Sequence, residues 1–401
     1  MRFRLLLASM MLTCWGVAAC SPQSDITQSN PSQLKVQQVE GEGFKLDIYD
    51  NSATFSQILT INASGQMIGM REVVDEAGTL FSQEVFFLDQ AKATKIPLLP
   101  GFTNVEVLGL SDSGLVVGYA SRPMGHAEGS LTGMVWDSRT GHSTRISPFP
   151  GDISCYTQAI SADGQRLVGY SAGSEPPRMR PCVWNWNQGG ESWEAVLLDS
   201  PFDYNPYLMA SRVAISPDGL HVAACVTVAE LPNNMFDSSL HAWDWSEGQW
   251  QRRFVSDEQM YLYDMNNHGT IAGVITTPEG RKPCVVDSQG GLTLLELLPG
   301  DESGEARGID SAGMVVGFSD DPAGPSGGPQ AFVWRAGVTQ PLELPEGTMF
   351  SAAYGLNEHG QIGGLLDVAL PQTEEHGESD EPTEKTLAFR WTPKPAPARL
   401  P

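Results

Sequence analysis

Few residues in this sequence combine the types and spacing that catalysis requires. The segment GYSAG (169–173) matches G-x-S-x-G, the pattern of a serine nucleophile at a sharp turn from a strand into a helix. The residues that follow it, SEPPRMRP (174–181), contain three prolines and cannot begin a stable helix. Ser171 also occupies the same place as Ala120 and Ser319 in a repeated pattern. We therefore interpret the match as part of a repeated strand.

Metal and cofactor motifs give no prediction either. The sequence lacks H-E-x-x-H, clustered Cys/His spacing and a calcium-binding loop of the D-x-[DN]-x-[DN]-G type. His268 and His359 each precede a glycine by one residue, which is typical of an exposed turn. The acidic stretch EEHGESDEPTEK (374–385) has the composition of a solvated loop. We predict no catalytic residues, no metal and no cofactor.

The amino terminus has the features of an export signal. Arg2 and Arg4 precede an apolar run, residues 5–15, that is too short to span a bilayer, and small residues follow it. The sequence VAAC (17–20) resembles the lipobox of bacterial lipoproteins. That resemblance implies cleavage of residues 1–19, a lipid on Cys20 and, because Ser21 follows, attachment to the outer membrane of the cell envelope, facing the periplasm or the cell surface. An ordinary secreted protein is the alternative.

Composition limits the partners of the exported chain. The full sequence has 24 Lys+Arg against 48 Asp+Glu, and its net charge of −24 excludes binding to nucleic acid or to an anionic membrane by bulk charge. Membrane contact is therefore expected through the lipid alone. Residues 20–43 are rich in Ser, Gln and Asn, and we interpret them as a flexible tether.

One pattern occurs seven times after the tether. Each copy has a short apolar strand, a polar tetrapeptide that ends in glycine, and a second strand, which together predict a tight hairpin. The hairpin glycines recur at intervals of 44 to 55 residues, and they are Gly65, Gly114, Gly164, Gly219, Gly269, Gly313 and Gly360. A third and usually a fourth strand complete each unit. Seven such units predict an all-β fold, a seven-bladed β-propeller of four-stranded antiparallel blades over residues 44–392, with a Pro-rich tail at 393–401. Two separate β-sandwiches are the alternative.

The third strands contain two columns of bulky residues with the period of two that a packed strand requires. We predict that the first column is Phe86, Met134, Cys182, Trp243, Cys284, Phe332 and Phe389. The second is then Leu88, Trp136, Trp184, Trp245, Val286, Trp334 and Trp391. The segment FKLDIYD (44–50) precedes the first hairpin and has no unit of its own. We expect it to be the outer strand of the last blade, joining the two ends of the chain.

The repeats resemble the extracellular HAF repeat family. The likeness lies in Gly-x-[IV]-x-Gly hairpins followed by x-Ala-aromatic-x-Trp, as in QAFVW (330–334) and LAFRW (387–391). The chain departs from this pattern at Cys284, Val286 and Ala224. The segment AISPDGLHVA (214–223) is similar to the WD40-like repeat of TolB-type periplasmic propellers. Both resemblances imply an exported propeller, and neither implies a particular activity.

Four cysteines remain after removal of the signal and lipidation of Cys20. Cys182 and Cys284 occupy an apolar column and are interpreted as small core residues. A disulfide, with three possible connectivities among the four, would most plausibly involve Cys155 or Cys225.

The links between second and third strands are long and divergent, which favours their face of the ring as the working face. Five residues there are candidates for binding: Arg122, Arg178, Arg180, Tyr204 and Tyr207. The arginines could receive a carboxylate or phosphate, or could balance nearby acids. We favour a lipid-anchored, non-catalytic scaffold that binds a protein or glycan partner. The alternatives are a glycan-active lyase or hydrolase and a structural part of an outer-membrane assembly complex.

Overall fold

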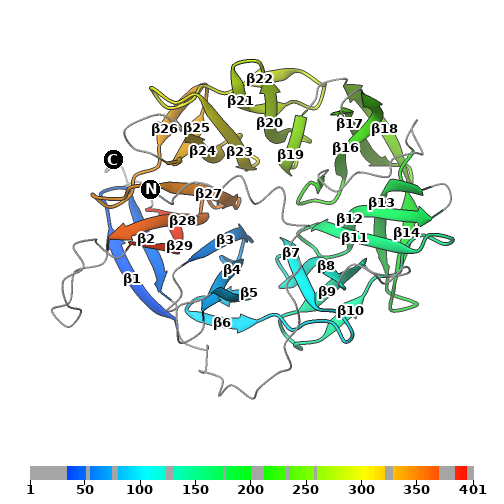
Figure 1. The fold of residues 1–401 in the computed structure, drawn as a ribbon. Coiled ribbons are helices and arrows are strands. Elements are labelled where there is room, and N and C mark those ends of the chain that lie inside the picture. Colours follow the sequence, from blue (N-terminus) through cyan, green and yellow to red (C-terminus); the bar gives the residue numbers. More distant parts are fainter. Residues whose placement is uncertain are drawn as a thin grey trace, which may run out of the picture.

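The computed structural model describes residues 34–50, 55–74, 80–122, 131–174, 177–199, 212–231, 235–256, 260–320, 328–369 and 384–394. In these residues every regular element is a β-strand, and the strands form seven antiparallel sheets. Figure 1 shows the sheets arranged radially as blades around a central axis. The predicted seven-bladed β-propeller is confirmed.

Blades 1 to 6 have four strands each, which follow one another outward from the axis in chain order. Blade 1 comprises β3 (Ser56–Ile61), β4 (Met67–Val74), β5 (Leu80–Asp89) and β6 (Lys92–Lys95). Blade 2 comprises β7 (Asn104–Leu110), β8 (Leu115–Ser121), β9 (Leu131–Asp137) and β10 (Ser143–Arg145). Blade 3 comprises β11 (Ser154–Ile160), β12 (Arg166–Ser174), β13 (Pro177–Asn187) and β14 (Ser192–Leu197). Blade 4 comprises β15 (Val213–Ile215), β16 (His221–Leu231), β17 (Met235–Ser246) and β18 (Gln249–Ser256). Blade 5 comprises β19 (Met260–Met265), β20 (Ile271–Thr277), β21 (Gly280–Val286) and β22 (Leu292–Leu294). Blade 6 comprises β23 (Ser303–Ile309), β24 (Val315–Asp320), β25 (Gln330–Arg335) and β26 (Val338–Pro341).

Blade 7 is built from both ends of the chain. Its inner strands are β27 (Ser351–Leu356), β28 (Ile362–Ala369) and β29 (Glu384–Pro393), and β2 (Phe44–Asp50) pairs with β29. The predicted closing strand is therefore confirmed. Asp47 of β2 is almost fully buried, and its carboxylate lies 2.7 Å from the Arg390 guanidinium of β29, so a charge pair reinforces the closure.

The prediction of a flexible tether was wrong for residues 35–40. They form β1 (Lys35–Glu40), a fifth strand that pairs with β2 along its length. Val36 and Val39 pack against the apolar cores beneath them. The polar composition of this segment gives no signal of a strand. Its two valines make apolar contacts only when β2 is in place.

The seven hairpin turns share one hydrogen-bond pattern. The first polar side chain of each turn accepts a hydrogen bond from a backbone N–H four or five residues later. The turn glycine has a positive φ, between 69° and 81°, which favours glycine over residues with a Cβ. The short polar tetrapeptide is thus specified by local hydrogen bonds.

Neighbouring turns are also hydrogen-bonded to one another around the axis. Asn62 Nδ2 donates to the Ser111 carbonyl, the backbone N–H of Asp112 to the Ala162 carbonyl, and the N–H of Ala162 to the Pro217 carbonyl. The contacts continue through later blades, and Asn357 Nδ2 finally donates to the Asn62 carbonyl across the closure. These turns therefore form a complete hydrogen-bonded ring on one face.

The second glycine of each repeat is required by close backbone packing. In six blades the inner strand has a β-bulge, and the glycine faces the residue where the bulge begins. A Cβ on Gly118, Gly169 or Gly317 would overlap a carbonyl oxygen of the inner strand. Blade 4 has no bulge between β15 and β16, and there Ala224 replaces the glycine. The departure from the repeat thus follows from a difference in the inner strand.

The predicted columns were wrong by two residues in blade 4. In the other blades the first-column residue pairs with the second glycine, as Met134 does with Gly118. In blade 4 the equivalent Ala224 pairs with His241, and Trp243 belongs to the second column. The indole N–H of Trp243 donates to the Asp199 carbonyl, as that of Trp184 donates to the Ser147 carbonyl.

His241 therefore takes the place of an apolar core residue. It is fully buried and stacks on Trp243, and its Nε2 lies 3.0 Å from the Ser239 hydroxyl. Burial, helped by the positive charge of Arg252, lowers the pKa of His241 to about 4, so its ring is neutral near pH 7.

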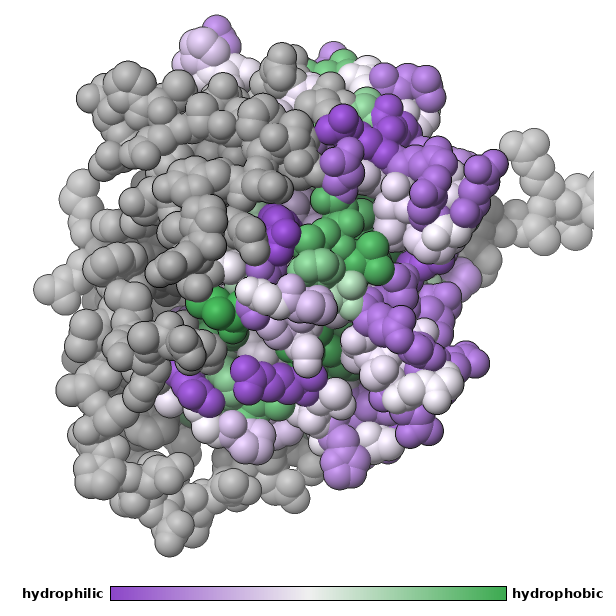
Figure 2. Space-filling model, turned by 90° about the vertical axis from the view of Figure 1, so that its right-hand side faces the viewer, coloured by the Kyte–Doolittle hydropathy of each residue, from purple (hydrophilic) through white to green (hydrophobic). Residues whose placement is uncertain are grey.

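Figure 2 views the side of the ring that carries β13 and β14. Hydrophobic residues gather near the middle of this view, with hydrophilic residues above, to the right of and below them. Val196 of β14 is one of the large apolar side chains with substantial exposure. The outer rim is thus a mixed surface of the kind that ordinary propeller blades present to solvent.

Substituting Gly118 with alanine tests the steric requirement. We expect Gly118→Ala to lower the free energy of unfolding by roughly 3 kcal/mol, because the Glu106 carbonyl must move to admit the Cβ. Gly43→Ala is the control, since its Cβ would enter open space. Denaturant titration measures both, and equal stabilities of the two variants would contradict the steric explanation.

Candidate functional site

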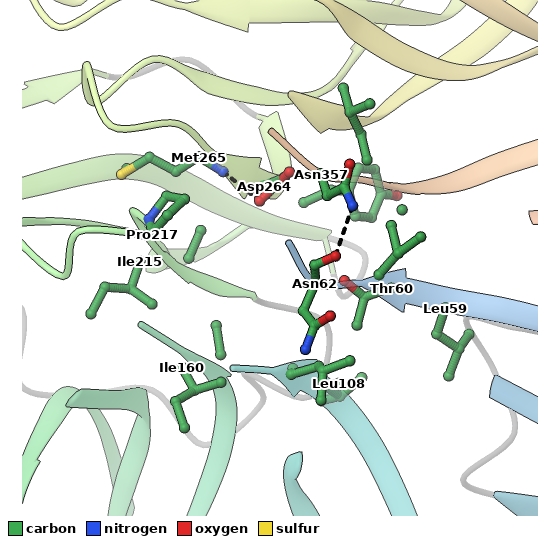
Figure 3. A pocket seen from close by; sticks show the side chains of 18 of the residues that line it. Leu59, Thr60, Asn62, Leu108, Ile160, Ile215, Pro217, Asp264, Met265 and Asn357 are labelled. Atoms are coloured by element: carbon green, nitrogen blue, oxygen red, sulfur yellow. Dashed lines mark hydrogen bonds between the residues drawn. The ribbon is translucent and has the colours of Figure 1, made fainter. Parts of the chain in front are cut away.

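The axis of the ring contains a cavity of about 200 Å³, lined by the inner strands and hairpins of all seven blades. That volume accommodates several water molecules or a group the size of an amino-acid side chain. Figure 3 shows side chains from many blades around this space, among them Leu108, Ile160 and Ile215. The cavity is the candidate site because every blade contributes to it.

The wall of the cavity differs from blade to blade at one repeated position. This position lies three residues before the first polar residue of each hairpin. Blades 1, 2 and 4 place Leu59, Leu108 and Val213 there, and blade 3 places Gln158. Blades 5, 6 and 7 place Tyr263, Arg307 and Tyr354. A fold with seven equivalent blades thus has an aliphatic wall on one side of its channel and an aromatic, cationic wall on the other.

Four residues form the aromatic and cationic wall, and we call them the Arg–Tyr cluster: Arg212, Tyr263, Arg307 and Tyr354. The Arg307 guanidinium carbon lies 3.9 Å from the centre of the Tyr263 ring and 5.4 Å from that of Tyr354. The Arg212 guanidinium carbon lies 5.6 Å from the Tyr263 ring centre. Tyr263 therefore contacts two cations through cation–π interactions.

Glu305 compensates part of this positive charge. Its carboxylate is almost fully buried and forms ion pairs of 2.5 Å with both Arg281 and Arg307. Arg281 Nη2 also lies 3.4 Å from the Tyr263 hydroxyl, a long hydrogen bond. Arg281 and Glu305 lie near the starts of β21 and β23, so the cluster is toward the end of the channel opposite the hairpins.

Arg212 differs from the other cations of the channel. Within the part of the chain that the structure describes, no carboxylate forms an ion pair with it. Burial and the neighbouring charge of Arg307 lower the pKa of the Arg212 guanidinium. Burial likewise raises the pKa of the Tyr354 hydroxyl to about 12, so both tyrosines are neutral hydrogen-bond donors near pH 7.

Asp264 lies toward the hairpin end of the cavity (Figure 3). Its two carboxylate oxygens accept hydrogen bonds from the backbone N–H groups of Met265 and Ile309, so it links blades 5 and 6. Burial raises the pKa of Asp264 to about 6, against the opposing effect of these two hydrogen bonds. Asp264 therefore changes charge between pH 5 and 7.

The candidate binding residues lie apart from the Arg–Tyr cluster where the structure describes them. Arg122 stacks on Phe102, with 4.6 Å between its guanidinium carbon and the ring centre. Arg180 donates hydrogen bonds of 2.9 Å to both oxygens of the buried Asp152 carboxylate, which is charge balancing within the protein. The side chain of Arg178, and Tyr204, Tyr207 and Cys20, lie outside the described residues. The binding role of this set stays a prediction.

The other motifs have structural roles. Ser171 lies within β12, and its hydroxyl donates to Asp152 and accepts from the Phe149 N–H, so the serine is part of a repeated strand. His268 and His359 are exposed turn residues, as predicted. Cys155, Cys182, Cys225 and Cys284 are all buried and free, so the disulfide considered for Cys155 or Cys225 is not formed.

The described residues lack two further features. They contain no group of three or more His, Cys, Asp or Glu side chains placed to hold a metal ion. They also contain no helix with the length and apolar character needed to cross a bilayer.

Sequence reasoning missed the Arg–Tyr cluster. Its members occur in strands whose other residues follow the apolar repeat, and no motif marks them. The available signal was the aligned repeat itself, in which Tyr263, Arg307 and Tyr354 replace the leucines of blades 1 and 2. Arg212 could not be found in this way, because it stands one residue off the repeated position.

Comparisons with known proteins extend the fold assignment. The β-propeller domain of the Trilobed protease from Pyrococcus furiosus aligns with 84% of this chain and 94% of its own length, at 13% identity and a TM-score of 0.51. Acylaminoacyl peptidase from Pyrococcus horikoshii aligns with 79% of this chain and 50% of its own, at 12% identity and a TM-score of 0.50. At such identities the likeness establishes the propeller fold alone.

Sequence comparison gives no family. No family model matches the chain, and no curated protein matches it. The resemblance to HAF repeats and the export signal therefore stay predictions.

The raised pKa of Asp264 predicts a specific dependence of stability on pH. Because the pKa of about 6 in the folded protein exceeds the ordinary value of 3.8, the contribution of Asp264 is complete below pH 4 and is lost as pH rises through 6. Between pH 4 and 7, Asp264→Asn should gain stability relative to the wild type by up to about 3 kcal/mol.

Denaturant titrations at both pH values measure this change. Asp112→Asn is the control, since Asp112 lines the same cavity from an exposed turn. A difference between Asp264→Asn and wild type that does not vary with pH would show that Asp264 ionises as readily as an exposed carboxyl.

Proposed function

We propose that this protein is an exported propeller, held at the cell envelope by a lipid on Cys20, that binds a ligand or partner through its central channel. The observation that carries the proposal is the asymmetry of the channel wall. Seven repeats with equivalent backbones place leucines on one side and the Arg–Tyr cluster on the other. An apolar surface that faces convergent polar groups is typical of a ligand site.

A binding role is supported over catalysis by the state of the channel carboxylates. A glycan-active enzyme of the common type needs two carboxylates that are free to reach the glycosidic bond. Asp264 accepts two backbone hydrogen bonds, Glu305 forms two ion pairs, and Glu358 accepts hydrogen bonds from Ser311. These groups are held by the protein itself.

Access to the channel connects the cluster with the predicted binding face. The Arg–Tyr cluster lies toward the end of the channel where the second strand of each blade leads into the third. Arg122, Arg178, Arg180, Tyr204 and Tyr207 belong to the links at that end. We propose that the ligand or partner approaches through this face, where Arg180 is paired with Asp152, and that it contacts Arg122, Arg178, Tyr204 and Tyr207.

The lipid anchor is tested by labelling cells with a fatty-acid analogue. We expect wild type and Cys14→Ser to carry the label, because Cys14 lies in the proposed signal peptide. Cys20→Ser should carry none and should no longer fractionate with the envelope. A wild-type protein that is unlabelled and washes freely from membranes would contradict the anchor.

The binding function is tested by crosslinking and capture of the full-length protein from its native envelope. A variant with alanine at Arg122, Arg178, Tyr204 and Tyr207 should capture its partner roughly tenfold less well, because we propose that these residues contact the partner. The control carries alanine at His268 and His359, the exposed turn residues of the opposite face. Absence of any specific partner, or equal losses in both variants, would contradict the proposal.

A further inference from the structure

Arg212 is a channel-lining cation that forms no ion pair with a carboxylate among the described residues. Its side chain lines the channel cavity and is partly exposed there. Its guanidinium makes a cation–π contact with Tyr263, and the charges of Arg307 and Glu106 also act on it. A guanidinium has five N–H donors, and the described residues supply no ion-pair partner for those of Arg212. Arg212 is therefore prepared for an acceptor that comes from outside the chain.

The charges around Arg212 indicate how much negative charge that acceptor carries. Arg212, Arg281 and Arg307 are three cations, and the buried carboxylate of Glu305 compensates one of them. Glu106, an exposed side chain of β7 whose charge acts on Arg212, offsets a second. Around the Arg–Tyr cluster one positive charge then remains, which a singly charged anion neutralises, while Asp112, Asp264 and Glu358 carry negative charge toward the hairpin end of the cavity. A dianion such as phosphate would leave an excess of one negative charge around the cluster.

The opposite wall indicates what accompanies the anion. Blade 1 stands across the ring from blade 4, and Leu59 of blade 1 and Leu108 of blade 2 face the cavity at the position that tyrosine or arginine holds in blades 5 to 7. Aliphatic side chains favour an apolar group and offer no hydrogen bonds. A ligand that satisfies both walls carries one anionic group on an apolar body.

We propose that Arg212, with Tyr263 beside it, binds the carboxylate of such a ligand, and that Leu59 and Leu108 contact the apolar group attached to it. A guanidinium binds a carboxylate through two parallel N–H···O hydrogen bonds, which also fix its orientation. The side chain and free carboxylate of a C-terminal aliphatic residue have this chemistry. The inference rests on the proposed binding function and specifies the chemical class of the ligand.

Ligand-detected NMR titration of the full-length protein tests the assignment with N-acetyl-L-leucine. N-acetyl-L-leucinamide has the same shape without the charge, and inorganic phosphate supplies an anion without an apolar body. We expect the acid to bind at least about tenfold more tightly than either, because only the acid makes charge-assisted hydrogen bonds while filling the apolar side.

Variants locate the effect. Arg212→Gln should remove the preference for the acid, and Arg212→Lys should keep part of it, because lysine retains the charge but not the paired hydrogen bonds. Arg139→Gln is the control, since Arg139 forms an exposed ion pair with Asp137. Thermal melting confirms that each variant is folded.

The possible outcomes distinguish a failure of this ligand assignment from a failure of the proposed binding function. Equal binding of acid and amide, tighter binding of phosphate, no binding of the acid, or an unchanged preference in Arg212→Gln would overturn the assignment. Should envelope capture still depend on the entry face in that case, the binding function would stand with a different ligand class. Loss of capture as well would overturn both.

Discussion

The pairing of β2 with β29 closes the ring and lets every blade pack against two neighbours. A propeller blade is a twisted sheet whose two faces are both apolar, and it can bury them only against the blades on either side. An open ring would leave one face of blade 1 and one face of blade 7 in water. The pairing of β2 with β29, the Asp47–Arg390 ion pair and the Asn357–Asn62 hydrogen bond together join these two blades. Closure therefore links the stability of the whole ring to its amino-terminal strand.

Closure also creates the channel and sets the geometry of the candidate site. The bulges of the inner strands bring the backbone so close to the second strand that only glycine fits there in six blades. The inner strands are thereby fixed against their sheets, and the side chains at the channel position point into one small cavity. The repeated backbone is symmetrical, but the side chains on it are not. Function in such a fold depends on where the repeat is broken.

Blade 4 is the clearest example of a broken repeat. It has no bulge between β15 and β16, an alanine in place of the second glycine, and a buried histidine in the apolar column. Arg212 precedes β15 directly and enters the channel where the neighbouring blades have bulged strands. Blade 4 therefore contains both the shifted third strand and Arg212, the channel cation without an ion pair among the described residues.

The sequence by itself determined the number of blades, their strand order and the closing strand, because those features repeat with local signals. Turn glycines, polar tetrapeptides and alternating apolar residues act over a few residues, and seven copies reinforce one another. The strand formed by residues 35–40 could not be predicted in this way, since its valines are stabilised only by β2 and the cores beneath. The register of His241 and Trp243 was ambiguous in the sequence, because the third strand of blade 4 can be aligned with the repeat in two ways that differ by two residues. The Arg–Tyr cluster was decided by tertiary structure alone. Its residues come from blades 4 to 7 and are far apart in the chain, and only the closed ring brings their charges and rings together around one axis.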